Sequence, residues 1–176
     1  MMKKLIATLI LAALCLTGFA LAQTYTNADR DITFEYDENI FEISMEDETD
    51  DELLVILSAK DPAMGDAYIR IHYADLDDNE TFPTLADFAD MKESLGVEVQ
   101  QGEWNGFTNV ISYDMPGEDI TESIFIVPVY DDDGDNEVED ILTIGIGVTK
   151  LDDEEAAMSR DDAISAVMDS LKVLDD

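Results

Sequence analysis

Alternating apolar and polar residues predict strands in the first part of the chain. Residues 32–36 read Ile-Thr-Phe-Glu-Tyr, and residues 40–44 read Ile-Phe-Glu-Ile-Ser. Both runs have the two-residue period of a half-buried strand, and the turn residues between them predict a hairpin. The acidic run 46–52 predicts a solvated loop, and the apolar run 53–57 predicts a short buried strand.

A further strand is expected at residues 67–74, where alternation separates two sets of side chains. One face carries Ile69, Ile71 and Tyr73, and the other carries Tyr68, Arg70 and His72. The chain has a single histidine, so the second face alone combines histidine with arginine. Such a face is most often plain surface, and it is also a candidate binding surface.

The middle of the chain predicts a helix over residues 84–95. Thr84 is a favourable N-cap, Asp87 follows three positions later, and Gly96 is a typical helix end. The apolar residues of this segment fall on one stripe, comprising Leu85, Phe88, Ala89 and Leu95. We therefore expect one side of a central helix to pack on the sheet.

Two later strands are predicted at residues 124–129 and 142–148, joined by the acidic loop 131–140. Gly145 and Gly147 lie on the same face of the second strand. Glycines in a strand interior often mark the close approach of another group. We expect another group to pack closely over them.

A closing helix completes the pattern, with Ser159 as its expected N-cap. Its apolar stripe has the spacing of an amphipathic helix and comprises Ile164, Val167, Met168 and Leu171. The order of elements is strands, helix, strands, helix, and hairpin turns dominate the connections. This predicts an α+β fold with a mainly antiparallel sheet, on which a central helix and a C-terminal helix pack.

Residues 1–22 have the pattern of a cleavable signal peptide. Lys3 and Lys4 provide the positive start, an apolar run follows, and small residues at positions 20 and 22 predict cleavage after Ala22. Residues 23–176 would then form a single acidic domain that is secreted or periplasmic. A retained membrane anchor is the alternative, because the apolar run is close to the length that spans a bilayer.

Cys15 is the only cysteine and raises a second alternative, lipidation. Leu14 is too large for the position before a lipidated cysteine, and Cys15 lies inside the apolar run. We therefore expect it to leave with the signal peptide. The mature domain would contain neither a disulfide nor a thiolate metal site.

Charge is the strongest feature of the composition. The formal net charge is −34, and all 43 acidic residues follow the predicted cleavage site. Such a charge disfavours nucleic acid and anionic membranes as partners. It favours cations or basic proteins, and it is also typical of a heavily solvated surface adapted to salt.

The sequence does not favour catalysis, and we expect a non-enzymatic protein. The mature chain would have only His72 as an imidazole and would have no cysteine nucleophile. It contains no phosphate loop, metalloprotease histidine pair or dinucleotide fingerprint. A hydrolase with paired carboxylates is a third-ranked alternative. Its ranking is low because, among 43 acidic residues, two lie close together by chance and need not form a catalytic pair.

The loop between the two later strands is a candidate calcium site. Carboxylates of Asp131, Asp133, Asp135 and Glu137 surround Gly134, and calcium prefers oxygen ligands. The spacing is not that of an EF-hand, because its first position would be a valine and no helix precedes it. A solvated hairpin tip is the favoured interpretation, with weak calcium binding as the alternative; no other cofactor is expected.

Trp104 and Phe107 flank the dipeptide Asn105-Gly106, which predicts a tight hairpin turn. Aromatic residues beside such a turn usually pack on their own hairpin. Exposed at a loop, they would instead form a contact surface for a partner. Both interpretations remain open from the sequence.

The chain resembles the PsbP-like superfamily, which includes the Mog-like proteins, in the order and texture of its elements. The segments that carry the resemblance are 32–43, 84–95, 103–107 and 168–172. The resemblance implies an α/β/α sandwich that acts by binding. It transfers no functional residue, and the extreme acidity is a departure from the family.

We therefore expect an exported accessory or binding domain that recognises a protein partner through a sheet face or a loop. The alternative is a calcium-dependent extracellular module whose acidic loops become ordered on binding the ion.

Overall fold

The computed structural model of this chain describes residues 22–76, 81–130 and 137–174. A seven-stranded sheet has the order β3-β4-β5-β9-β8-β7-β6, and a three-stranded sheet has the order β1-β2-β10. Every strand pairing is antiparallel. The large sheet comprises β3 (Phe41–Glu48), β4 (Glu52–Ala59), β5 (Ala67–Asp75), β6 (Gln100–Trp104), β7 (Phe107–Pro116), β8 (Ile120–Tyr130) and β9 (Val138–Thr149).

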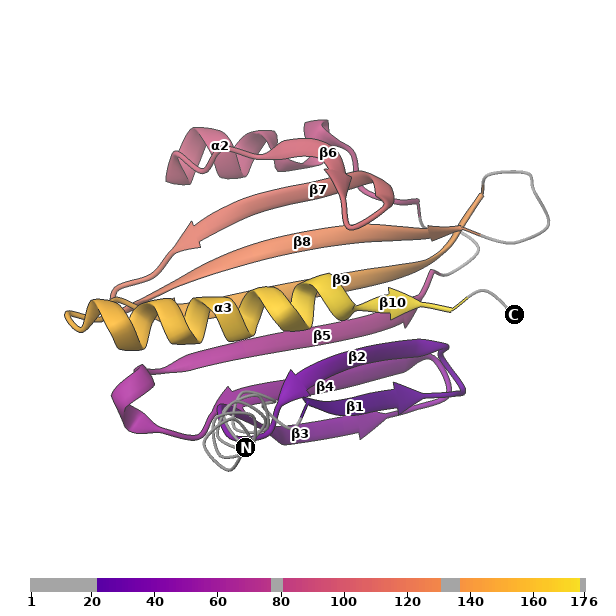
Figure 1. Ribbon diagram of the computed structural model, residues 1–176. Helices are drawn as coiled ribbons and strands as arrows, with labels where there is room; N and C mark the ends of the chain where they lie inside the picture. The colour runs from indigo at the N-terminus through magenta and orange to yellow at the C-terminus, as the bar shows by residue number, and fades with distance from the viewer. Residues whose placement is uncertain (1–21, 77–80, 131–136, 175–176) are drawn as a thin grey trace, which may run out of the picture.

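One face of the large sheet is covered by helix α3 (Glu154–Ser170) and by the small sheet (Figure 1). The small sheet comprises β1 (Ala22–Asn27), β2 (Ile32–Asp37) and β10 (Lys172–Val173). The fold is thus mostly antiparallel sheet with few helices. This agrees with the predicted α+β class and its mainly antiparallel sheet.

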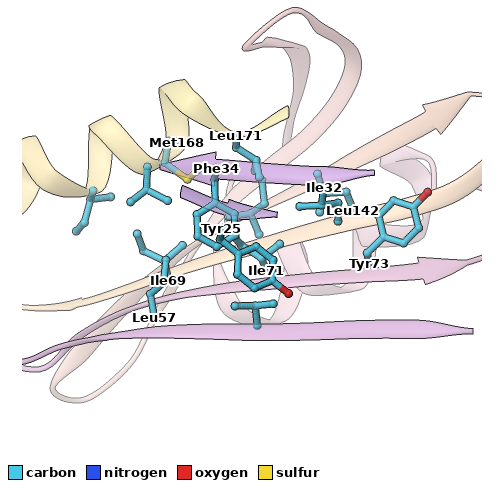
Figure 2. Packing of buried hydrophobic residues seen from close by; sticks show 14 of the residues in the cluster. Tyr25, Ile32, Phe34, Leu57, Ile69, Ile71, Tyr73, Leu142, Met168 and Leu171 are labelled. Atoms are coloured by element: carbon cyan, nitrogen blue, oxygen red, sulfur yellow. The ribbon is translucent and has the colours of Figure 1, made fainter. Parts of the chain in front are cut away.

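The core lies between these layers (Figure 2). Phe34 of β2 is only 1% exposed, and its ring stacks on that of Tyr25 with centroids 4.8 Å apart. Ile69 and Ile71 contribute from β5 below them. The predicted inward stripe of the closing helix is confirmed, because Ile164, Val167, Met168 and Leu171 are all buried. Each such side chain stabilises the fold by about 1.5–3 kcal/mol.

The predicted first hairpin is wrong, although both of its strands exist. β2 pairs with β1 and β10, whereas β3 pairs with β4. The two strands bury their apolar faces from opposite sides of one core: Phe34 points into it from β2 and Phe41 from β3. Alternation reveals which face of a strand is buried, but not which strand is its neighbour.

The predicted acidic loop at residues 46–52 is wrong over its first part, because β3 continues through Glu48. Glu46 accepts a hydrogen bond of 2.8 Å from the Tyr25 hydroxyl, and most of the other acidic side chains are exposed. β3 is an edge strand of the large sheet. Charged residues on an edge strand are typical, since they oppose pairing with another chain.

The expected N-cap of the closing helix is also wrong. α3 begins earlier, because the Asp153 carboxylate accepts hydrogen bonds from the N–H groups of Glu155 and Ala156 at 3.0 and 3.1 Å. Ser159 therefore lies inside the helix. Acidic residues are favourable in the first helical turn, where they meet the positive end of the helix dipole.

The central helical segment is short and consists of 3₁₀ turn η2 (Leu85–Phe88) and helix α2 (Ala89–Leu95). The predicted cap interaction is confirmed: the Asp87 carboxylate accepts from the Thr84 N–H at 2.7 Å, which lowers the pKa of Asp87. The predicted apolar stripe is only partly packed. Leu85 is 44% exposed and Leu95 is 57% exposed.

The predicted turn at Asn105-Gly106 is confirmed, with positive φ at both residues (49° and 87°). The side chain of Asn105 reaches the C-terminal end of the closing helix, α3. The Asn105 amide donates to the carbonyl oxygens of Met168 and Leu171 at 3.1 and 2.9 Å. The β6–β7 hairpin is thereby fixed to the C-terminal end of α3.

Arg160 fixes the N-terminal half of the same helix to the end of β9. Its side chain is 5% exposed, and Nη1 donates to the Thr149 carbonyl oxygen at 2.8 Å. A second bond, of 3.0 Å, joins Nε to the Asp161 carboxylate. A buried guanidinium needs such partners, because an unpaired buried charge is strongly unfavourable.

Candidate functional site

The face of the large sheet turned away from α3, here named the outer face, carries the candidate binding residues of β5. Tyr68, Arg70 and His72 alternate with the buried Ile69 and Ile71, as predicted, and each is half-buried. Strand register sets their neighbours on β9. Tyr68 is paired with Gly147 and Arg70 with Gly145.

The two glycines allow these side chains to lie flat on β9, so the predicted close approach is confirmed. A Cβ atom added at Gly147 would overlap the Tyr68 ring. One added at Gly145 would overlap the Glu122 carboxylate and would lie 3.1 Å from the Arg70 guanidinium. Tyr68 and Arg70 therefore form a low platform across the middle of the sheet.

Glu122 of β8 completes the platform. Its Oε1 atom lies 3.0 Å from Nη2 of Arg70. Burial, and then the Glu122 charge, raise the pKa of Tyr68, so this hydroxyl stays protonated and able to donate. Sequence reasoning missed Glu122, because only the register of β8 on β9 brings it beside Arg70.

Arg70 also has an unsatisfied donor. Among the residues described, its Nε is the one buried side-chain nitrogen or oxygen atom without a hydrogen-bond partner. Next to it lies a cavity of about 290 Å³ lined by Leu54, Arg70, His72 and Thr143. His72 Nε2 is 3.6 Å from the Glu52 carboxylate, at the margin of this cavity.

Apolar side chains extend the platform toward the edge of the sheet. Leu54 and Ile56 of β4 are half-buried beside His72 and Arg70, and Met45 of β3 is 50% exposed beside Ile56. We name this set the open sheet face: Met45, Leu54, Ile56, Tyr68, Arg70 and His72. The side chains are a mixture of aliphatic, aromatic and cationic groups.

The η2–α2 segment contacts the other half of the outer face at β7. The Phe88 ring lies 5.6 Å from that of Tyr113, between ring centroids. Ile111 and Ile124 of β7 and β8 are buried in this half. This contact is separated from the open sheet face by β9 and β8.

Comparison of the chain with known protein families, with curated proteins and with solved structures found no match. The candidate site therefore depends on the geometry of this chain alone.

The structure places Trp104 and Phe107 away from the β5 residues, on the core side of the sheet. Their rings stack with centroids 5.9 Å apart, and Phe125 of β8 lies 5.5 Å from Trp104. All three pack against the core. The five predicted surface residues therefore fall into two groups, on opposite faces of one sheet.

The predicted calcium loop falls mostly outside the described residues. This applies to Asp131, Asp133 and Asp135, whereas Glu137 is described and exposed just before β9. Within residues 22–76, 81–130 and 137–174, no group of three or more His, Cys, Asp or Glu side chains is arranged to hold a metal ion. Calcium binding by this loop stays a prediction.

Residues 1–21, which carry most of the predicted signal peptide, also lie outside the described residues; strand β1 starts at Ala22. In the part of the chain that is described, no helix is both long enough and apolar enough to cross a membrane.

A polar cluster that the sequence did not reveal lies where β5 and β9 meet the β1–β2 turn. The Tyr73 hydroxyl donates to the Asp140 carboxylate, and the Arg30 guanidinium lies 5.8 Å from the centroid of the Tyr73 ring. Arg30 is also paired with Asp75. Burial raises the pKa of Asp140, against the opposing effects of the Tyr73 hydrogen bond and the Arg30 charge.

Replacing Asp140 with asparagine is expected to raise the urea midpoint at pH 7, since the amide removes a partly buried charge and can still accept from Tyr73. A raised folded pKa costs stability only as the pH rises through it. The gain should therefore shrink as the pH falls toward 4. Asp119→Asn, in the exposed turn between β7 and β8, controls for the general relief of negative charge. An equal gain in both variants would contradict the prediction.

Proposed function

We propose that this protein is an exported, non-enzymatic binding domain that recognises a protein partner through the open sheet face. The observation that carries the proposal is the platform at its centre. There Tyr68 and Arg70 are held flat over two glycines, and the Arg70 side chain is still 40% exposed while paired with Glu122. The outer N–H groups of this oriented guanidinium are available to an acceptor group of a partner.

The chemistry of the surrounding side chains supports a protein partner. Tyrosine, arginine and methionine are enriched at protein interfaces, and binding energy concentrates in tyrosine and arginine anchors. Glu42, Asp47 and Glu52 are exposed around the β3–β4 margin of the open sheet face. This combination of a mixed centre and an acidic margin favours a partner with basic residues around an apolar patch.

The sequence resemblance to PsbP-like proteins agrees with a binding role. In an α/β/α sandwich of that kind, α3 and the η2–α2 segment would be the two helical layers. Export through a signal peptide at residues 1–22, to the periplasm or to the outside of the cell, is part of the same proposal.

Site-specific crosslinking tests the proposal. A photo-crosslinking residue at position 56 should give a discrete adduct in the extracytoplasmic fraction of the source cells. Arg70→Ala should reduce the yield of this adduct at least about tenfold. That is the effect of losing ~1.4 kcal/mol of binding free energy from an interface anchor. Gly147→Ala should also reduce it, because the added methyl group displaces the Tyr68 ring. Arg70→Ala should stay folded, since Arg70 is only half-buried; Gly147→Ala changes a buried position of β9, so its fold is checked by circular dichroism before its crosslinking yield is compared.

Position 165, exposed on α3, is the matched control for the crosslinker. The same adducts from positions 56 and 165, or an adduct at 56 that Arg70→Ala leaves unchanged, would rule out the open sheet face as the recognition surface.

A further inference from the structure

Cleavage after Ala22 would make Gln23 the first residue of the mature protein, at the start of the small sheet. β1 starts at Ala22, and Gln23 is exposed and paired in register with Tyr36 of β2. β1 is the edge strand of this sheet, so within the described residues its other side pairs with no strand. The side chain and the new α-amine of Gln23 would therefore both be accessible.

A single hydrogen bond holds the Gln23 side chain, as far as the described residues show. Its Nε2 donates to Oε2 of Glu38 at 3.1 Å, in the turn that follows β2. Glu38 is itself fixed, because its carbonyl oxygen accepts a hydrogen bond of 2.9 Å from Nζ of Lys60. The Gln23 carboxamide is thus directed at the turn and away from its own backbone nitrogen. The contact is exposed, so it opens readily.

A glutamine at the first position of a chain can cyclise. The uncharged α-amine attacks Cδ of the carboxamide, and a new C–N bond forms. The Cδ–Nε2 bond breaks, and ammonia leaves with the proton that the amine gives up. The step needs no oxidant, reductant or second substrate. Its product is pyroglutamate, a lactam that lacks the positive charge of a free N-terminus.

The strand geometry of β1 accepts this lactam. Ring closure restricts rotation about the N–Cα bond of Gln23, and with no residue before it this rotation positions no other part of the strand. The lactam nitrogen keeps one N–H group, as the peptide nitrogen of Gln23 has in the structure. Pairing of β1 with β2 from Thr24 onward is therefore preserved, and Tyr25 stays buried in the core.

We propose that Gln23 is a modification site at which the exported protein closes its N-terminus as pyroglutamate, and that Glu38 slows this reaction. The Glu38 carboxylate holds the carboxamide away from the amine. It also favours the charged ammonium form, which has no lone pair for the attack. Glu35 and Asp37, on either side of Tyr36, add to this second effect. Closure removes the free amine that aminopeptidases require. The inference rests on the proposed export and is independent of the open sheet face.

Intact mass and the mass of the N-terminal peptide test the inference on protein recovered from an exporting host. Warm incubation should convert the chain of residues 23–176 to a species lighter by one ammonia, with the loss located in the N-terminal peptide. That location distinguishes it from ammonia loss at an internal asparagine. Persistence of uncyclised Gln23 would overturn the inference and leave the export proposal intact. A mature chain that starts at any other residue would overturn the predicted cleavage site and this inference with it.

Two variants test the role of Glu38. Glu38→Ala removes both the acceptor and the charge, and it should speed closure by about two- to tenfold, the population factor of one hydrogen bond. Glu38→Gln keeps an acceptor and should give a smaller increase. Glu118→Ala, in the exposed turn between β7 and β8, is the matched control and should close at the wild-type rate. Equal rates in all four proteins would overturn the role proposed for Glu38. None of these results bears on crosslinking at position 56.

Discussion

Replacing Phe34 with alanine is expected to lower the free energy of unfolding by about 3–5 kcal/mol. Phe34 is 1% exposed and stacks on Tyr25, in the layer between the small sheet and the large one. Its removal leaves a cavity that neither rigid sheet can close. Because domains of this size have a total stability of only about 5–15 kcal/mol, the variant should be close to unfolding.

Urea unfolding measures this effect, with the fluorescence of Trp104, the only tryptophan, as the signal. Phe34→Leu keeps most of the volume and should cost less than about 1.5 kcal/mol, the usual range for such exchanges. Ile56→Ala, on the open sheet face, is the matched control for loss of apolar volume outside the core. A loss below about 1 kcal/mol in Phe34→Ala would show that the small sheet does not stabilise the domain.

Asn105→Asp is expected to destabilise the fold by about 2–4 kcal/mol at neutral pH, although it changes a single atom of the side chain. The native amide donates to the carbonyl oxygens of Met168 and Leu171 at the end of α3. A carboxylate there would face those same oxygens at the negative end of the helix dipole. Attraction is thereby replaced by repulsion.

The pH dependence distinguishes repulsion from the mere loss of hydrogen bonds. Repulsion raises the folded pKa of the introduced carboxyl above its unfolded value. The cost is therefore smallest at low pH, where the protonated carboxyl still donates one hydrogen bond, and it grows as the pH rises through the folded pKa. Asn105→Gly is the control: it accepts the positive φ, lacks the donor, and should cost about 1–2 kcal/mol at every pH. A pH-independent loss in Asn105→Asp would contradict the repulsion argument.

Local features of the fold could be predicted from the sequence. Alternation identified β5 and assigned its two faces, and Gly145 and Gly147 indicated the close packing now seen under Tyr68 and Arg70. The dipeptide Asn105-Gly106 identified its turn. Each of these predictions depends on neighbouring residues in one strand or turn.

Features that depend on distant pairing could not be predicted. The hairpin between β2 and β3 was expected because the two strands are adjacent in sequence, yet they line opposite sides of the core. Strand β10 is only two residues long and gives no periodic signal. The start of α3 was misplaced because the acidic residues before Ser159 resemble those of the exposed loops.

The candidate sites show the same division. Tyr68, Arg70 and His72 could be grouped from alternation, whereas the partner Glu122 depends on the register of three strands. Trp104 was included in the predicted binding surface only because an aromatic residue beside a turn can be exposed. In the structure it lies on the other face of the sheet, next to Phe125.

The turn at Asn105 also sets how this protein ages. Asparagine followed by glycine is the pair in which the next backbone nitrogen most readily attacks the side-chain amide, releasing ammonia and leaving aspartate or isoaspartate after hydrolysis. In the native fold the Asn105 amide is tied to two carbonyl oxygens of α3. The reaction therefore requires transient opening of the β6–β7 hairpin away from the end of α3. Each molecule that reacts gains a negative charge beside the carbonyl oxygens at the end of that helix, where it destabilises the fold. Stored samples should accumulate a slowly growing fraction that is one charge more acidic and less stable.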